Sequence, residues 1–153
     1  MGRQQLPIRP TLSPGGENSL ASVDPCELLT PSIKATLGIV GAPQTQGGST
    51  SKLCQWRVDG GTTATSYTYG VPVLFKSGID KVVAVGEKKP LMVNSRRGIQ
   101  SLGVGGSVCA VSIEVTATSR VEVTGTGAGS NDGSLLCPKV QAAAELLEPE
   151  LPK

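Results

Sequence analysis

The chain has 153 residues, enough for one domain with its own hydrophobic core. Its net charge is only +2, too small to favour a surface for nucleic acid or anionic membrane. With one Trp, two Tyr and one Phe, the chain also lacks the rings for a platform that stacks single-stranded nucleic acid.

The first segment, residues 1–22, is interpreted as a flexible tether. Its stretch RPTLSPGGENS is rich in Pro, Gly and Ser and has no apolar period, so it cannot bury enough surface to become ordered. It contains no apolar signal-peptide core, and we expect any leader to be missing from this sequence. Residues 23–153 are expected to form a single folded domain.

Two helix starts follow the tether. Asp24 and Thr30 are good N-cap residues, and each is followed by a proline, which fits the first position of a helix. We expect order to begin at Asp24, with Cys26 in a helical turn and a short helix after Thr30 that ends at Gly38.

The next segments predict strands. After a loop at 41–51, residues at period two share one face of a strand in 52–61, namely Cys54, Trp56 and Val58. Residues 62–75 are rich in β-branched and aromatic side chains and predict a second strand, bent or placed at an edge by Pro72.

The middle of the chain, residues 76–106, gives weaker patterns. Residues 81–85 and 90–94 look like short strands separated by a charged turn at 86–89. By contrast, residues 108–127 give a clear β-hairpin, in which Cys109, Val111, Ile113 and Val115 share one face and Val121 and Val123 answer from the return strand.

The chain ends in a predicted helix. Val140, Ala143, Ala144 and Leu147 form the stripe of a helix that lies on a core. The Gly-rich loop before it, GTGAGSNDG, resembles a dinucleotide fingerprint, but Ser130 stands at the third glycine position. Too little chain follows to complete a βαβ unit, so we interpret this stretch as a connection.

We therefore predict an α+β domain. It has a twisted antiparallel sheet of about five or six strands, the usual sheet size, with N-terminal and C-terminal helices packed on it.

Four cysteines, at positions 26, 54, 109 and 137, allow three disulfide pairings. The spacing favours Cys26 with Cys54 and Cys109 with Cys137, because each pair is then separated by 28 positions. Each bridge would join the start of a helix to the inner face of the sheet. The alternatives are four free thiols in a cytosolic protein, or a zinc site, for which no C-x-x-C pair and no histidine is present.

Catalytic motifs are missing from the sequence. The absence of histidine excludes every His-based triad, general base and metal site, and paired cysteines would leave no thiolate nucleophile. We expect no cofactor and no enzymatic activity. The alternative enzyme is a hydrolase or transferase that uses carboxylates or a Ser-Lys pair, although Glu114 and Glu122 are expected on the outward face of the hairpin.

Two groups of residues are candidates for contact with a ligand or partner. The tyrosines of the second strand are one group, and Trp56 is better assigned to the core because it shares a face with Cys54. The segment 87–98 concentrates positive charge and could meet an anionic surface, although such a run also protects a sheet edge from aggregation. The predicted contact residues are Tyr67, Tyr69, Lys88, Lys89, Arg96 and Arg97.

The order D-P-C-x-L-L-T, then C-x-W, then a hairpin cysteine, then a cysteine opening a terminal helix that ends in LP resembles a known family. It is similar to secreted actinobacterial lipoproteins grouped as domain of unknown function 3558, over residues 23–152, although residues 76–106 carry none of the pattern. The matching residues are Asp24, Pro25, Cys26, Leu28, Leu29, Thr30, Cys54, Trp56, Cys109, Cys137, Leu151 and Pro152.

The resemblance implies a protein of the cell envelope with no known enzymatic activity. Such proteins are anchored through a lipidated cysteine upstream of a Pro/Ser-rich tether, and that cysteine is absent from this sequence. We expect a monomeric, extracytoplasmic domain that binds an envelope ligand or a partner protein, and no nucleic acid. A sensor-like ligand-binding domain, similar in plan to those of mycobacterial receptor kinases, is an alternative at the level of fold only.

Overall fold

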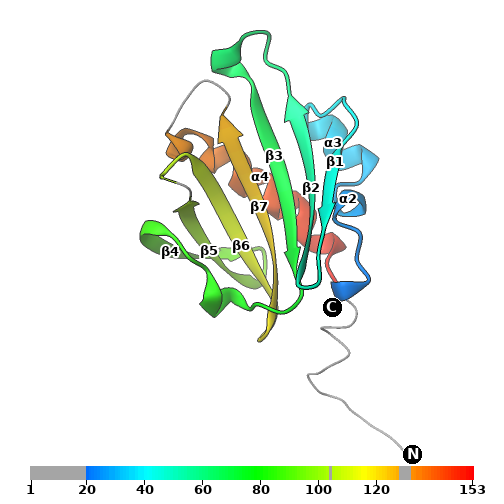
Figure 1. The fold of residues 1–153 in the computed structure, drawn as a ribbon, viewed down its shortest axis with the longest axis vertical. Coiled ribbons are helices and arrows are strands. Elements are labelled where there is room, and N and C mark those ends of the chain that lie inside the picture. The colour runs from blue at the N-terminus through cyan, green and yellow to red at the C-terminus, as the bar shows by residue number, and fades with distance from the viewer. Residues whose placement is uncertain (1–19, 104, 128–131) are drawn as a thin grey trace, which may run out of the picture.

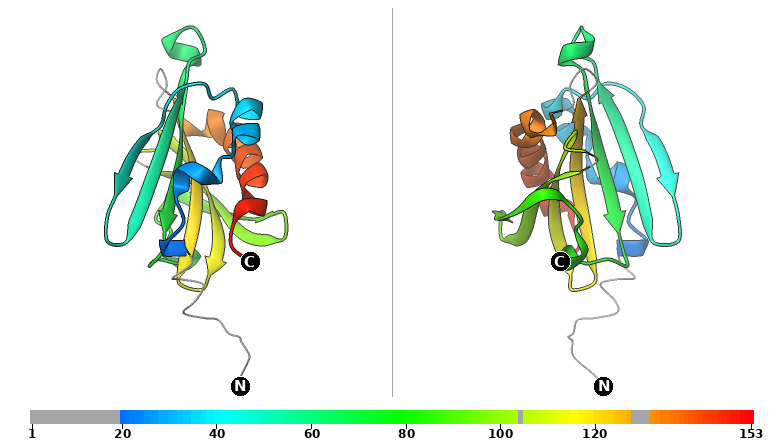
Figure 2. Two further views of the ribbon diagram at one scale, coloured as in Figure 1. Left: turned by 90° about the vertical axis from the view of Figure 1, so that its right-hand side faces the viewer. Right: turned by 60° about the vertical axis from the view of Figure 1, so that its left-hand side comes forward.

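The protein is described here by a computed structural model, which covers residues 20–103, 105–127 and 132–153. It has two layers, a twisted antiparallel sheet and a group of α-helices that lie on one face of it (Figures 1 and 2). Most of the predicted tether and part of the predicted Gly-rich connection lie outside the described residues.

The sheet has seven strands in the order β1-β2-β3-β7-β6-β5-β4, and all neighbouring pairs are antiparallel. The strands are β1 Gln44–Gly47, β2 Ser51–Val58, β3 Tyr67–Leu74, β4 Val85–Val93, β5 Arg96–Gly103, β6 Val108–Thr116 and β7 Ser119–Gly127.

The prediction of an α+β domain is confirmed, but the sheet is larger than the expected five or six strands. β1 and β5 have no counterpart among the predicted strands. β1 lies within the predicted loop 41–51, and all four of its residues are exposed. The strand predicted at 90–94 corresponds to the end of β4, and the rest of β4, which is exposed, was not predicted. A strand that buries almost nothing has no apolar alternation, so its sequence shows no strand period.

The prediction for residues 76–106 was wrong in detail. Residues 81–85 are not a strand, because Ile79–Lys81 is a short 3-10 helix and β4 begins only at Val85. The expected charged turn at 86–89 lies inside β4, where the pairing with β5 shifts between Val85 and Lys89. The chain turns instead at Asn94, whose φ of 55° suits the left-handed conformation that asparagine tolerates.

Pro72 does not lie in an edge strand, because β3 is paired with both β2 and β7. The pairing with β7 skips Val71 and Pro72, which is consistent with the N–H that proline lacks. After β3 the chain crosses past the β6–β7 turn to reach the far edge. A Cβ on Gly78 would lie 2.2 Å from the carbonyl oxygen of Ala117, so only glycine fits this crossing.

The helices begin as the sequence predicts. In α2 (Pro25–Leu28) the Asp24 side chain accepts from the Cys26 N–H at 2.9 Å, and in α3 (Pro31–Leu37) Thr30 accepts from the Ile33 N–H at 3.3 Å. Gly38 ends α3 at a φ of 77°. In α4 (Cys137–Leu147) the predicted stripe is fully buried, which confirms the expected core face of the last helix.

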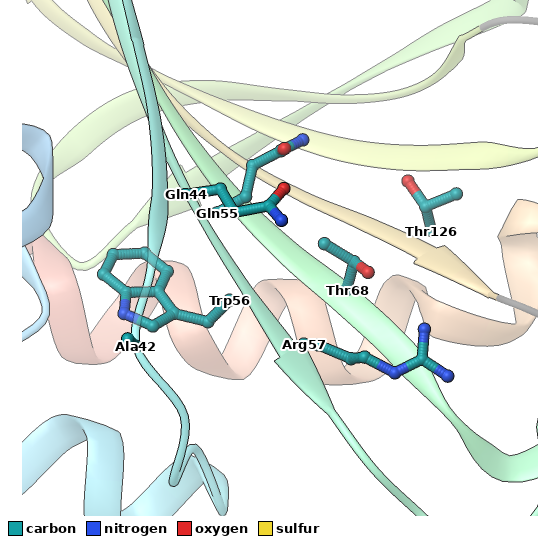
Figure 3. A pocket seen from close by; sticks show the side chains of 7 residues that line it. All are labelled: Ala42, Gln44, Gln55, Trp56, Arg57, Thr68 and Thr126. Atoms are coloured by element: carbon teal, nitrogen blue, oxygen red, sulfur yellow. The ribbon is translucent and has the colours of Figure 1, made fainter.

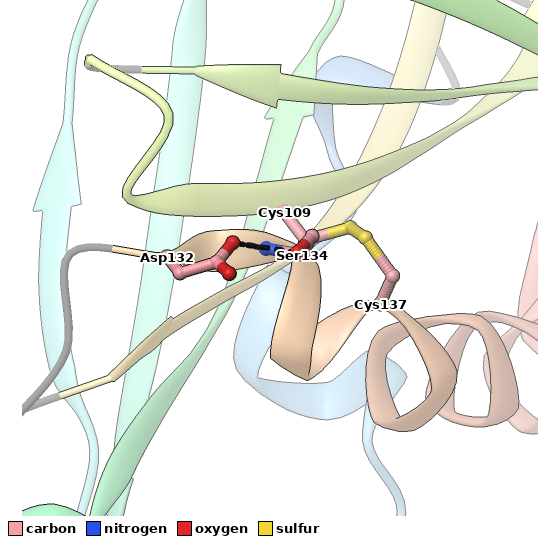
Figure 4. The surroundings of a disulfide bond; sticks show 4 residues. All are labelled: Cys109, Asp132, Ser134 and Cys137. Atoms are coloured by element: carbon pink, nitrogen blue, oxygen red, sulfur yellow. Dashed lines mark hydrogen bonds between the residues drawn. A yellow bond between two sulfur atoms is a disulfide. The ribbon is translucent and has the colours of Figure 1, made fainter.

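Both predicted disulfides are confirmed. Cys26 in α2 is bonded to Cys54 in β2, and Cys137 at the start of α4 is bonded to Cys109 in β6 (Figure 4). Cys54 and Cys109 are fully buried on the inner face of the sheet. The disulfides therefore attach α2 and α4 to the same face of the sheet.

The core lies between the sheet and the helices. It contains Trp56, which is only 1% exposed. This burial agrees with the prediction that Trp56 shares a strand face with Cys54. Ordered packing begins earlier in the chain than Asp24, because the side chain of Leu20 is fully buried although residue 20 was assigned to the tether. The opposite face carries no α-helix among the described residues, and we call it the bare face (Figure 2). Only its end near Arg120 is covered, by the crossing from β3 to β4 with the short 3-10 helix Ile79–Lys81.

Candidate functional site

The bare face of the sheet carries a polar hollow of about 360 Å³ (Figure 3). Gln55 and Arg57 of β2 alternate with the buried Cys54, Trp56 and Val58, so their side chains point away from the core. Neutral amides and hydroxyls make up most of its polar lining. The lining residues are Ala42, Gln44, Gln55, Trp56, Arg57, Thr68 and Thr126.

Strand register brings these residues together from four strands. Gln44 of β1 lies opposite Gln55 of β2. One step along the same face, Thr68 of β3 lies opposite both Arg57 of β2 and Thr126 of β7. Directly opposed residues of an antiparallel pair project to the same face of the sheet. The glutamine pair and the row of Arg57, Thr68 and Thr126 therefore form one polar surface.

Arg57 is the cation of this hollow. No ion pair joins its guanidinium to a carboxylate within residues 20–103, 105–127 and 132–153. The nearby Asp59 is occupied in the turn after β2, where its Oδ1 accepts from the Gly61 N–H at 2.9 Å and from the Ser66 hydroxyl at 3.4 Å. The hollow therefore offers one positive charge among neutral hydrogen-bonding groups.

The predicted tyrosine contacts lie on the other face, against the helices. The rings of Tyr67 and Tyr69 meet edge to face with centroids 5.3 Å apart, and Lys139 of α4 places its Nζ 5.4 Å from the Tyr67 ring. Tyr69 is 2% exposed. Burial raises the pKa of the Tyr69 hydroxyl above its ordinary value, and the adjacent Tyr67 adds to the shift.

The predicted basic contacts do not form one surface. Lys88 and Lys89 are exposed on the edge strand β4. The Arg97 guanidinium pairs with Asp80 and Glu114 at 3.1 Å each. Arg96 is bound on the helix side instead, where its Nε donates to Glu148 at 2.9 Å. The structure brings none of these four residues into the hollow.

A buried polar cluster on the bare face is held together by its own hydrogen bonds. Arg120 is 7% exposed, and its Nε donates to the Glu122 carboxylate at 2.7 Å. The Ser112 hydroxyl donates to the same carboxylate oxygen at 3.0 Å, and Arg120 also donates to the carbonyls of Ser77 and Gly78. This cluster fixes the crossing from β3 to β4.

Of the residues that line the hollow, sequence reasoning singled out Trp56 alone and assigned it to the core. A usable signal existed only within β2, where Gln55 and Arg57 are the polar positions between three buried ones. The contributions of β1, β3 and β7 depend on pairing between distant segments, which a local pattern does not contain.

In the described part of the chain, no three His, Cys, Asp or Glu side chains gather as a metal site would require. No described helix is long and apolar enough to cross a membrane. All four cysteines are in disulfides.

The family model described as "Protein of unknown function (DUF3558)" matches residues 7–150, nearly the whole chain. The chain belongs to this family. The match confirms the family that the motif pattern predicted. It also includes residues 76–106, which contain none of the residues of that pattern. No curated protein and no solved structure matches this DUF3558 chain.

Proposed function

We propose that this protein is a non-catalytic, extracytoplasmic domain of the cell envelope that binds a ligand or partner protein in the polar hollow on its bare sheet face. The hollow itself is the observation that carries the proposal. Both disulfides and the α-helices α2, α3 and α4 lie on the opposite face, so they stabilise the domain without covering the hollow.

The extracytoplasmic location is supported by the disulfides. Structural disulfides form and persist in oxidising compartments and are rare in the cytosol. Membership of the DUF3558 family agrees with this location through the resemblance to secreted actinobacterial lipoproteins. We extend the proposal to a lipid anchor on a cysteine that is not part of this sequence, with the segment before Leu20 as the spacer.

The non-catalytic assignment is supported by the buried carboxylates. A hydrolase that uses carboxylates needs two titratable groups that converge in a cleft. Among the described residues, Glu122 and Glu148 are the carboxylates most enclosed by protein, and each is held by an arginine. Of the described residues, no Asp, Glu, Lys or Ser lines the hollow.

A thermal-shift screen against envelope peptides, glycans and lipids tests the proposal. Thr68→Arg places a large side chain in the hollow, and Ala142→Arg places the same side chain at an exposed position of α4 on the other face. We expect at least one class to raise the Tm of the unmodified protein and of Ala142→Arg but not of Thr68→Arg. A screen in which no class raises the Tm, or in which the rise survives Thr68→Arg, would refute the proposal.

A further inference from the structure

The edge of the sheet has a step beside the hollow. β1 pairs with β2 only from Gly47↔Lys52 to Gln44↔Gln55, whereas β2 remains paired with β3 as far as Val58. If the pairing of β1 with β2 continued in the same register, Ala42 would lie opposite Arg57. Ala42 is outside β1, however, and Pro43 lies between it and the strand. Figure 3 draws Ala42 toward the Trp56 indole, on the other side of β2 from the Arg57 guanidinium.

The backbone of Arg57 faces this step. The Gly48 N–H donates to the Ser51 carbonyl at 2.9 Å, so Ser51 directs its backbone groups toward β1. Successive residues of a strand alternate in this direction, and therefore Leu53, Gln55 and Arg57 also direct their N–H and C=O toward that side. Gln55 has a strand partner there and Arg57 has none among the described residues.

The side chain of Arg57 is also open. It lies in the hollow beside the two glutamines and two threonines and has no carboxylate partner in the described ranges. One residue thus presents an unpaired backbone donor, an unpaired backbone acceptor and a cation at one place. Such groups match an extended peptide that carries a carboxylate, because strand addition satisfies the backbone and the guanidinium binds the acid.

We propose that the edge of β2 at Arg57 captures a short, extended, acidic peptide segment of a partner protein by strand addition. The inference rests on the proposed function and names the ligand class of the same hollow. The peptide backbone pairs with Arg57, its carboxylate binds the Arg57 guanidinium, and Gln44, Gln55 and Thr68 supply amide and hydroxyl contacts. A saccharide that bears a carboxylate would use the guanidinium but would not need the paired backbone groups.

Selection from a displayed library of random octapeptides tests the inference. The whole chain is the bait, and one enriched peptide is then synthesised with a fluorescent label for measurement of its Kd. We expect enriched peptides to share an Asp or Glu and to bind more weakly as salt rises. Arg57→Gln should raise the Kd about tenfold or more, since it removes a charge-assisted pair. Lys76→Gln removes an exposed charge beyond the far end of β3 and should leave the Kd unchanged.

Hydrogen exchange of the Arg57 amide provides the readout for strand addition. That amide should exchange rapidly in the free protein and become protected when the peptide binds. Peptides without an acidic residue, a Kd insensitive to Arg57→Gln, or an unprotected Arg57 amide would each overturn the inference. In any of these cases, an enriched peptide that binds the unmodified protein but not Thr68→Arg would leave the proposed function standing.

Oligogalacturonate is the second probe. Binding of oligogalacturonate that depends on Arg57, with no peptide enriched, would assign the hollow to a carboxylated glycan and overturn the peptide inference alone. If neither probe binds and the thermal-shift screen is also negative, the inference and the proposed function both fail.

Discussion

The Arg96 guanidinium, which lies at the start of β5, donates through Nε to the Glu148 carboxylate at 2.9 Å, across 52 positions of the chain. Arg96 also donates to the Pro152 carbonyl, so one side chain holds the C-terminal segment to the sheet. Asn94 donates to the other Glu148 oxygen at 2.9 Å. This small network closes the end of α4, beyond the reach of either disulfide.

Replacing Glu148 should destabilise the protein. Glu148→Ala removes two charge-assisted hydrogen bonds, and we expect a loss of about 1–3 kcal/mol in the free energy of unfolding. Chemical denaturation near neutral pH measures it. Glu150→Ala is the matched control, because Glu150 lies two residues away and is exposed. An equal loss in both variants would contradict the role given to the network.

The same network predicts an acid dependence. The hydrogen bond from Asn94, followed by that from Arg96, lowers the pKa of Glu148 in the folded protein, although burial opposes the shift. A lowered folded pKa gives stability that is complete above the unfolded pKa of about 4.3 and is lost as pH falls through the folded pKa. The difference in unfolding free energy between the unmodified protein and Glu148→Gln should therefore shrink below about pH 4. A difference that stays constant into acid would contradict this origin.

The two disulfides should contribute similarly to stability. Each closes a loop of 28 positions, so the chain-entropy argument assigns each roughly 3–4 kcal/mol. We expect the paired substitutions Cys26→Ser with Cys54→Ser, and Cys109→Ser with Cys137→Ser, to lower the free energy of unfolding by comparable amounts. Intact mass of the denatured, unmodified protein should be about four hydrogens below the reduced value. Four alkylatable thiols in a preparation from an oxidising compartment would contradict the structure.

The sequence predicted best those parts of the fold that face the core. Residues such as Cys54, Trp56 and Val58 alternate because they are buried, and the α4 stripe repeats for the same reason. The edge strand β1 was missed because all its residues are exposed, and only the end of β4, at 90–94, was predicted because most of β4 buries little. The hollow was missed because its members come together only through register, a property of four paired segments.

Conversely, clustering along the chain was a poor guide to a site. Arg96 and Arg97 are adjacent in sequence, yet successive strand residues point to opposite faces. Arg96 accordingly reaches Glu148 on the helix side, while Arg97 pairs with Asp80 and Glu114. A run of positive charge in a strand is therefore divided between two surfaces.

Gly78 should be intolerant of a side chain. Its backbone, at φ −78° and ψ 179°, is one that alanine adopts easily, so any effect of Gly78→Ala comes from contact. The added Cβ would meet the backbone carbonyl of Ala117 at 2.2 Å, which cannot move without disturbing the β6–β7 turn. We expect a loss of about 1–3 kcal/mol in the free energy of unfolding, typical of overpacking.

Gly103→Ala is the control for that prediction. It places the same methyl group at the end of β5, where nothing described lies within 4 Å of it. Its free energy of unfolding should change by about 0.5 kcal/mol or less, as for other surface substitutions. If Gly78→Ala were as stable as Gly103→Ala, the close crossing from β3 to β4 would be wrong.

Tyr69 should make the protein sensitive to alkali. Burial, with a further contribution from Tyr67, raises the folded pKa of Tyr69 above the unfolded value of about 10. The neutral phenol is then favoured by folding, so this stability is present below about pH 10 and is lost as pH rises toward the folded pKa. Between about pH 9 and about pH 11, the free energy of unfolding should therefore fall less steeply in Tyr69→Phe than in the unmodified protein.

Tyr67→Phe is the control for this prediction. It keeps the buried Tyr69 phenol and should retain most of the slope, because burial is the larger cause of the shift in the Tyr69 pKa. Equal slopes in all three proteins would show that Tyr69 ionises as freely as a solvent-exposed phenol.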